Sequence, residues 1–310
     1  MCKCLYCYRP LREGEKDFHP ACARKLFGST DVPTLEYTAE QLDSLALEII
    51  RDSTSLTGVQ PKLSLHLTRH SGGSRLTIVG LWGAYICKPQ TPQYPELPEN
   101  EDLTMHLASL AHIAVVPHTL MHMADGSLCY LTRRIDRLGD GSKLPMEDLC
   151  QLTGRQTEHK YRSSYERAGK AVMQYSSLPR LDVAGFFETV FFCYLTGNND
   201  MHLKNFSLYE PEDGTVRLTP AYDLLSATIA NPADPEELAL TLNGRKRKLG
   251  RDDFLAAAET LGIDPKTVLR LIEKYRRLLP SMEELIRGSF LSTPFQDSYI
   301  SLIHERLGRL

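Results

Sequence analysis

The sequence predicts an α+β fold of two lobes, with a small antiparallel sheet ahead of a mainly helical part and a cysteine- and histidine-rich module in front of both. Residues 60–88 fall into short alternating apolar and polar runs separated by small-residue turns, which is typical of antiparallel strands. Beyond residue 134 the pattern is mainly helical. We therefore expect a module at residues 1–28, a sheet lobe at 38–133 and a helical lobe at 134–310.

The composition limits the classes of partner. With 310 residues, 42% of them hydrophobic and 24% charged, the chain has ample material for a core. Its net charge of -3 gives no overall positive field for nucleic acid, so such a contact requires a local basic patch. No apolar run reaches the ~18 residues of a membrane span, and the first residues lack the apolar stretch of a secretory signal. We expect a cytoplasmic protein without a membrane partner.

The first residues carry two close pairs of metal-binding side chains, Cys4 with Cys7 and His19 with Cys22. Two such pairs are the arrangement that tetrahedral zinc favours. The module is too small to fold around a core of its own, so bound Zn²⁺ would supply its stability as a structural metal. Cys2 is an alternative ligand in the first pair. Reduced cysteines beside a surface histidine, or a module that has lost its metal, remain the alternative.

The sheet lobe begins with a helix and three strands. Thr38 and Gln41 form a capping box ahead of apolar residues at helical spacing, so a helix should begin at Thr38. Alternating segments predict strands at residues 62–67, 76–79 and 84–88.

A helix and two further strands complete this lobe. Leucines at helical spacing predict a helix over residues 100–112, with Glu101 in its first turn. Strands are expected at residues 115–121 and 127–132.

In the helical lobe, a polar loop at residues 197–205 follows an apolar helix at 181–196 and precedes a hairpin at 206–219. The turn signal Pro-Glu-Asp-Gly inside the hairpin brings its open ends together. Asn205 before the first strand and Asp223 after the second should therefore be neighbours.

These residues suit phosphoryl transfer. Asn205 and Asp223 supply the hard oxygen ligands that Mg²⁺ prefers. Asp200 is then free to accept a proton from an attacking hydroxyl, and Lys204 can neutralise charge on the transferred group. The spacing Asp-x4-Asn matches the catalytic loop of protein kinases. The alternative is that these are turn and capping residues.

A kinase also needs a cradle for triphosphate and a fixed cation. The loop at residues 53–62 is rich in small residues, but its single glycine, Gly58, makes a weak phosphate loop. Lys88 at a strand end and Glu101 in the next helix resemble the lysine and glutamate pair of protein kinases. An ordinary loop and a solvated surface lysine are the alternatives.

Taken together, six segments resemble the HipA family of serine/threonine kinase toxins. They are residues 55–62, 86–89, 100–101, 134–137, 199–207 and 218–227. The resemblance implies a protein kinase-like two-lobed fold that uses ATP and Mg²⁺. It also implies that Asp200 is the catalytic base and that Asn205 and Asp223 are magnesium ligands.

The resemblance extends to the rest of the site. It implies that Lys88 contacts phosphate, that Arg134 and Ile135 lie near the hinge beside adenine, and that further side chains line the site. These are His202, Lys204 and Tyr222. The remaining expected ATP-binding residues are Gly58, Val59, Gln60, Lys62 and Glu101.

The family also suggests self-inactivation by autophosphorylation, with Ser55 the first candidate and Thr57 the second. A phosphate group adds about -1.5 to -2 charges, which would repel the phosphates of ATP from this loop.

The partners that the resemblance implies belong to a toxin–antitoxin system. They are a translation component such as an aminoacyl-tRNA synthetase as substrate, and an antitoxin that binds DNA, so that any DNA contact is indirect. Long members carry a further N-terminal subdomain, whereas this chain is similar to the short, split members, in which a separate small protein supplies it. Arg133 stands where we expect a glutamate before the hinge arginine, which departs from the family pattern.

The densest basic run is residues 245–248, extended by Arg251. It is either a solvated loop or a contact with DNA in an antitoxin complex or with an RNA-bound substrate. Two other functions stay open: a small-molecule kinase of the same fold, and a catalytically inactive binding module that acts as a corepressor.

Overall fold

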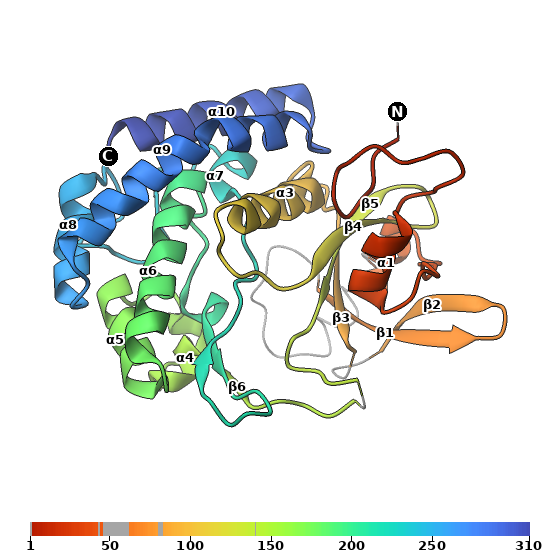
Figure 1. Cartoon of the computed structure of the whole chain (residues 1–310), viewed down its shortest axis with the longest axis horizontal. Helices are drawn as coiled ribbons and strands as arrows, with labels where there is room; N and C mark the ends of the chain where they lie inside the picture. The colour runs from red at the N-terminus through yellow and green to blue at the C-terminus, as the bar shows by residue number, and fades with distance from the viewer. Residues whose placement is uncertain (1, 43, 46–61, 80–82, 140) are drawn as a thin grey trace. The chain divides into compact units, whose positions relative to one another are not determined.

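A computed structural model of the chain describes residues 2–42, 44–45, 62–79, 83–139 and 141–310. They form two compact units, one of Met1–Asp102 with Val116–Ser142 and one of Leu103–Val115 with Lys143–Leu310. The first unit holds the main sheet and the second holds most of the helices (Figure 1). Among the described residues, no helix is long and apolar enough to cross a membrane.

The first unit is built on a five-stranded antiparallel sheet in the order β2-β1-β3-β5-β4. Its strands are β1 (Leu63–His70), β2 (Gly73–Ile78), β3 (Tyr85–Pro89), β4 (His118–His122) and β5 (Leu128–Arg133). The side chains of β1 alternate in burial at its start, as the apolar pattern predicts for a sheet with one covered face. The strands at the centre of the order, β3 and β5, place Lys88 opposite Tyr130.

The N-terminal module packs directly on this sheet. Its helix α1 (Pro20–Phe27) ends at Gly28, which adopts the left-handed conformation typical of a helix stop. The hydroxyl of Tyr85 donates to the carbonyl oxygen of Leu26 at 3.1 Å, and the Phe27 and Tyr85 rings lie 6.1 Å apart. The module is therefore covered by the sheet and is not a free appendage.

The predicted capping box is present in the first unit. The amide of Thr38 donates to the side chain of Gln41 at 2.9 Å, and the amide of Gln41 donates to the hydroxyl of Thr38 at 3.2 Å. Residues 39–42 and 44–45 are helical.

Helix α3 (Leu97–Leu110) begins three residues earlier than the leucine spacing predicts. Pro98 suits the first turn of a helix, because its missing N–H is not needed there. Glu101 consequently lies in the second turn, and the expectation that it lies in the first was wrong; Glu99 is the first-turn acid.

The second unit is organised around helix α6 (Pro179–Thr196), in which all side chains from Val190 to Thr196 are buried. Its other helices are α4 (Leu149–Leu152), α5 (Tyr165–Tyr175), α7 (Ala227–Ala230), α8 (Arg251–Thr260), α9 (Pro265–Arg287) and α10 (Thr293–Gly308), with 3₁₀ turns η1 (Thr157–His159) and η2 (Leu203–Asn205). The Phe191 ring lies 5.0 Å from that of Phe254 in α8 and 5.5 Å from that of Tyr275 in α9. These aromatic contacts hold α8 and α9 around α6 (Figure 1).

The second unit also contains a small sheet whose strands come from before and after α6 in the chain. It has the order β6-β7-β8, from strands β6 (Met146–Asp148), β7 (Ser207–Tyr209) and β8 (Arg217–Leu218). The predicted hairpin is β7 with β8, which pair antiparallel with Leu208 opposite Leu218. Strand β6 was not predicted.

Candidate active site

The polar loop after α6 starts from a fixed point, Gly197. This residue has φ 70°, and its amide donates to the carbonyl oxygens of Cys193 and Tyr194. A Cβ atom at this position would lie 2.6 Å from Leu302 Cδ2 and 2.9 Å from Thr228 Cβ. Both the left-handed backbone and the close packing therefore require glycine here.

Amide side chains close the loop behind Gly197. The Asp200 amide donates to the Asn198 side chain at 3.2 Å, and Asn205 Nδ2 donates to the Asp200 carbonyl oxygen at 3.1 Å. The His202 amide donates to the same Asp200 carbonyl at 2.8 Å. The Asp-x4-Asn spacing thus corresponds to one hydrogen-bonded turn that fixes the backbone of Asp200.

Asp223 lies beyond β8, in the left-handed region with φ 61°. A left-handed backbone is uncommon outside glycine, although aspartate tolerates it better than most residues, and such strain is often stored at functional sites. Asp223 and Asp200 are both partly exposed. Each of the two carboxylates can therefore meet a ligand.

Tyr161 contacts Asp200, and sequence reasoning missed it. Its hydroxyl donates to Oδ1 of Asp200, and its ring packs edge-on against His202 at 5.0 Å. Burial chiefly, and then the negative charges of Asp200 and Asp223, raise the pKa of Tyr161. The phenol therefore stays protonated and serves as a hydrogen-bond donor to Asp200.

Lys204 and Tyr222 lie along the same loop. Lys204 Nζ pairs with Asp148 Oδ2 at 2.9 Å, where Asp148 also caps α4. The Tyr222 hydroxyl lies 2.7 Å from Ser207 Oγ and donates to the carbonyl oxygen of Lys204 at 3.2 Å. These bonds tie the loop to β7 and to the end of β6.

In the first unit, Lys88 and Glu101 form a buried ion pair. Lys88 Nζ lies 2.5 Å from Glu101 Oε1, and the residues are only 4% and 1% exposed. The Lys88 ammonium also lies 5.4 Å from the ring centre of Tyr130. Its low exposure excludes the alternative that Lys88 is a solvated surface residue. A buried ammonium group needs a carboxylate partner, and Glu101 supplies it.

The other residues expected around ATP are placed as follows. Arg134 makes a two-point contact with Asp136, at 2.9 Å from Nε and 2.8 Å from the terminal nitrogen, and Ile135 is half-buried. Lys62 is exposed, immediately before β1. Ser55, Thr57, Gly58, Val59 and Gln60 lie outside the described residues.

Asn205 and Asp223 in the second unit offer the types of oxygen ligand that magnesium takes. Asn205 uses its amide nitrogen on Asp200, and within the described parts of the chain no hydrogen bond engages its amide oxygen. That oxygen and the carboxylate of Asp223 are hard ligands of the kind that Mg²⁺ takes beside phosphate and water.

The module at the N-terminus brings its four predicted ligands together. The ligand atoms of Cys4, Cys7, His19 and Cys22 all lie within 4.8 Å of one another. Cys2, the alternative ligand, is exposed and lies outside this cluster.

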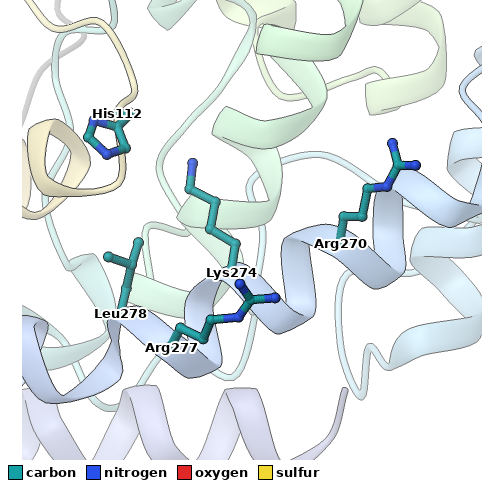
Figure 2. Close-up of a pocket in the computed structure, with 5 residues that line it drawn as sticks. All are labelled: His112, Arg270, Lys274, Arg277 and Leu278. Atoms are coloured by element: carbon teal, nitrogen blue, oxygen red, sulfur yellow. The ribbon is translucent and has the colours of Figure 1, made fainter.

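A separate hollow of about 320 Å³ lies on the second unit, lined by α9 and by the turn after α3 (Figure 2). Its lining residues are His112, Arg270, Lys274, Arg277 and Leu278. Lys274 donates to the carbonyl oxygen of Ala111, and its Nζ lies 2.5 Å from Glu188 Oε1. These contacts connect α9 with α6 and with the turn after α3. None of the predicted site residues that the structure describes lines this hollow.

The basic run is mostly solvated. Arg247 is exposed, Lys246 pairs with Glu236 at 2.9 Å, and Arg245 lies 3.9 Å from Asp253. Its contact with a partner stays a prediction.

Residues 54–282 match the family profile described as the HipA-like C-terminal domain. A presumed kinase of Haemophilus influenzae is 28% identical in an alignment of 286 positions that covers 83% of this chain and 81% of that protein. Two presumed kinases of Sinorhizobium fredii are 32% and 29% identical. Their alignments cover 72% and 79% of this chain but only 58% and 61% of those proteins.

Two solved structures share the fold. The structure of the toxin–antitoxin system HipA and HipB of Shewanella oneidensis with its operator DNA aligns with a TM-score of 0.70 and 22% identity, over 89% of this chain and 71% of that chain. The proinflammatory kinase CtkA of Helicobacter pylori aligns with a TM-score of 0.54 and 14% identity, over 76% and 90%. These likenesses confirm the predicted kinase-like α+β fold.

Proposed function

The chain belongs to the HipA-like family, as its motifs predicted, and from this premise we propose that it is an ATP-dependent serine/threonine protein kinase. The observation that carries the proposal is the closed turn in which Asn205 holds the backbone of Asp200, with Asp223 beyond the adjoining hairpin. An acid on a fixed backbone, next to an amide oxygen and a second acid, is what phosphoryl transfer requires.

In the proposed reaction, a substrate hydroxyl forms a bond to the γ-phosphorus of ATP while the bond from that phosphorus to the bridging oxygen breaks and ADP leaves. Asp200 accepts the proton of the attacking hydroxyl. Asn205 and Asp223 would hold Mg²⁺, which neutralises phosphate charge when it is bound. Because Asn205 fixes the Asp200 backbone, the base is oriented before substrate arrives.

Other side chains have supporting roles in this proposal. Lys88, kept in place by Glu101, contacts phosphate, as the corresponding lysine does in protein kinases. Lys204, which is part of the loop, lends positive charge to the site, and His202 and Tyr222 line the site. Arg134 and Ile135 are assigned to the hinge region, and Gly58, Val59, Gln60 and Lys62 to the phosphate loop.

We further propose that the chain is the toxin of a toxin–antitoxin system and lies in the cytoplasm. An antitoxin would hold it on DNA, a separate small protein would act together with it, and a translation component such as an aminoacyl-tRNA synthetase would be the substrate. Autophosphorylation at Ser55, or secondarily at Thr57, would inactivate it. The neighbour in complex with HipB and operator DNA supports the antitoxin part of this proposal.

The test is incubation with labelled ATP and cell lysate, followed by mass spectrometry of the chain and of labelled proteins. We expect label on the chain at Ser55 or Thr57 and on at least one lysate protein. Asp200→Asn should reduce the labelling of the chain and of the lysate protein by about a thousand-fold, because the substitution removes the proton acceptor. Asp252→Asn, an exposed aspartate in the first turn of α8, is the matched control and should leave them unchanged.

Three outcomes would contradict the proposal. Label transfer that persists in Asp200→Asn would remove that residue as the base. Phosphorylation of an antibiotic but of no protein would favour a small-molecule kinase. Absence of ATP binding would favour an inactive corepressor.

A further inference from the structure

The four ligand atoms of the N-terminal module lie within 4.8 Å of one another, and the two measured distances from His19 Nδ1 suit a tetrahedral metal site. Cys7 Sγ lies 3.4 Å from His19 Nδ1, and Cys22 Sγ lies 3.8 Å from the same atom. In a tetrahedron with Zn–S of about 2.3 Å and Zn–N of about 2.0 Å, the sulfur and nitrogen atoms lie about 3.6 Å apart. The two distances bracket this value.

The orientation of His19 is also that of a metal ligand. Its Nε2 lies 3.0 Å from the carbonyl oxygen of Pro10, so Nε2 carries the proton and donates it. Nδ1 then presents its lone pair to the three sulfurs. A backbone carbonyl that fixes the far nitrogen of a ligating histidine is a usual feature of zinc sites.

The first ligand pair lies on a tight turn. The Tyr8 amide donates to the carbonyl oxygen of Cys4 at 2.9 Å, and Tyr8 itself has φ 62°. A tyrosine gains nothing locally from a left-handed backbone, which costs roughly 1–2 kcal/mol. The turn brings Cys4 and Cys7 close together, and it sends the Tyr8 side chain into the unit, where the residue is 7% exposed.

The side chain of Tyr8 reaches α3, the helix that carries Glu101. Its hydroxyl donates to Asp102 Oδ2 at 2.7 Å, while His118 Nδ1 lies 2.7 Å from Asp102 Oδ1. Asp102 is fully buried and directly follows Glu101, the partner of Lys88. A short path of bonded and hydrogen-bonded atoms therefore joins the ligand cluster to the buried ion pair.

We propose that Cys4, Cys7, His19 and Cys22 bind one Zn²⁺ ion, and that the metal-held turn fixes Tyr8 on Asp102 and so braces the second turn of α3. The site has four protein ligands and no open position, so its role is structural. The proposal is independent of the kinase function, because its readouts are metal content and local backbone protection.

The first experiment measures metal by mass spectrometry on the purified chain. We expect one zinc per chain, and Co²⁺ exchanged into the site should show the visible absorption of a tetrahedral complex with thiolate ligands. Cys7→Ser and Cys22→Ser should lose most of the metal. Cys2→Ser is the matched control in the same module and should keep it, since Cys2 lies outside the cluster.

An absence of zinc and of tetrahedral Co²⁺ in the unaltered chain would overturn the metal site, whatever the folding state of the variants. So would equal metal loss in Cys2→Ser and Cys22→Ser, because the cluster would then have the wrong members.

The second experiment measures hydrogen exchange of the amides in residues 97–110. Removing zinc with a chelator, or Tyr8→Phe with zinc retained, should speed exchange in this segment by about ten-fold, the size expected for loss of a hydrogen bond to a charged group. Tyr6→Phe is the control: Tyr6 lies between the same ligands, and no hydrogen bond of its hydroxyl occurs among the described residues. Unchanged exchange after both treatments would contradict the proposed stabilisation of α3 by Tyr8, but it would not contradict the metal site.

Discussion

The loop after α6 and the first two turns of α3 both carry residues of the predicted site, but different forces hold the two segments in place. The loop is fixed by a buried helix, by Gly197 and by the amide bonds of Asn198 and Asn205. The α3 turns are held by ionisable groups: Glu101 pairs with Lys88, and Asp102 meets Tyr8 and His118.

This difference has a physical consequence. Packing and neutral hydrogen bonds hardly change with pH or metal, so the loop should keep its geometry across conditions. Buried charges and thiolate ligands respond to protons, metal and charge-removing substitutions. We therefore expect the α3 turns and the N-terminal module to be the sensitive region of the chain and the loop to be the constant one.

The strongest test of the comparison is Glu101→Ala. It removes the carboxylate that pairs with the buried Lys88 ammonium, which should lower the free energy of unfolding by about 3–5 kcal/mol in urea denaturation. Lys204→Met removes the half-exposed pair with Asp148 and should cost less than about 1 kcal/mol.

The double variant Lys88→Met with Glu101→Leu should recover most of this stability without restoring phosphoryl transfer. Equal losses of unfolding free energy in Glu101→Ala and Lys204→Met would mean that the buried and the partly exposed ion pair contribute equally to stability.

In the loop, Gly197→Ala should be costly for steric reasons alone. The left-handed backbone and the approach to Leu302 and Thr228 together predict a loss of about 3 kcal/mol. Gly185→Ala in the same helix has its nearest contact at 3.9 Å and should stabilise the chain by up to about 1 kcal/mol. The loss in Gly197→Ala should be equal at pH 5 and pH 8; a strong dependence on pH would break the comparison.

Glu99 makes the α3 turns sensitive to pH. Burial raises its pKa from the usual 4.5 to about 7. Because the folded-state pKa is the higher one, the folded state binds the proton more tightly. Its contribution to stability is full below pH 4.5 and is lost as pH rises through about 7.

Glu99→Gln cannot ionise, so its free energy of unfolding at pH 8 should exceed that of the unaltered chain by about 3 kcal/mol, with little difference at pH 4. Urea denaturation at the two pH values measures this. A gain that is the same at both would show that burial of the charge is not the cause.

The smallest expected effect is that of Tyr161→Phe, which removes the hydroxyl on Asp200 Oδ1 and keeps the ring against His202. A substrate hydroxyl needs the same oxygen, so the catalytic efficiency kcat/KM should rise several-fold, equivalent to about 1 kcal/mol. Steady-state kinetics with a protein substrate provides the measurement, and a fall in kcat would instead assign Tyr161 to holding Asp200 in place.

The sequence predicted the elements whose patterns are local. Alternation located the strands of the main sheet, and the turn at residues 211–214 located the hairpin that follows Asn205. The stop at Gly197 followed from a single glycine after an apolar helix. Strand β6 escaped notice because three residues, Met146–Asp148, carry no recognisable period.

Contacts between distant segments could not be predicted in this way. Tyr8 and Asp102 are separated by 94 positions, and the sequence around either residue does not predict their hydrogen bond. Tyr161 lies just after a 3₁₀ turn without periodic pattern, 39 positions before Asp200. In both cases the meeting depends on how the elements pack, and propensity and spacing do not contain that information.

The hydrogen bond from Tyr161 to Asp200 also bears on the competition between water and a protein hydroxyl in the proposed reaction. A lone water molecule that entered the loop would have to displace the Tyr161 hydroxyl from Oδ1, and it would gain only one hydrogen bond in exchange. A protein substrate gains contacts along its whole bound segment and completes the exchange more readily. In the proposed reaction, the Tyr161 hydroxyl would therefore disfavour hydrolysis of ATP by water relative to transfer to a protein.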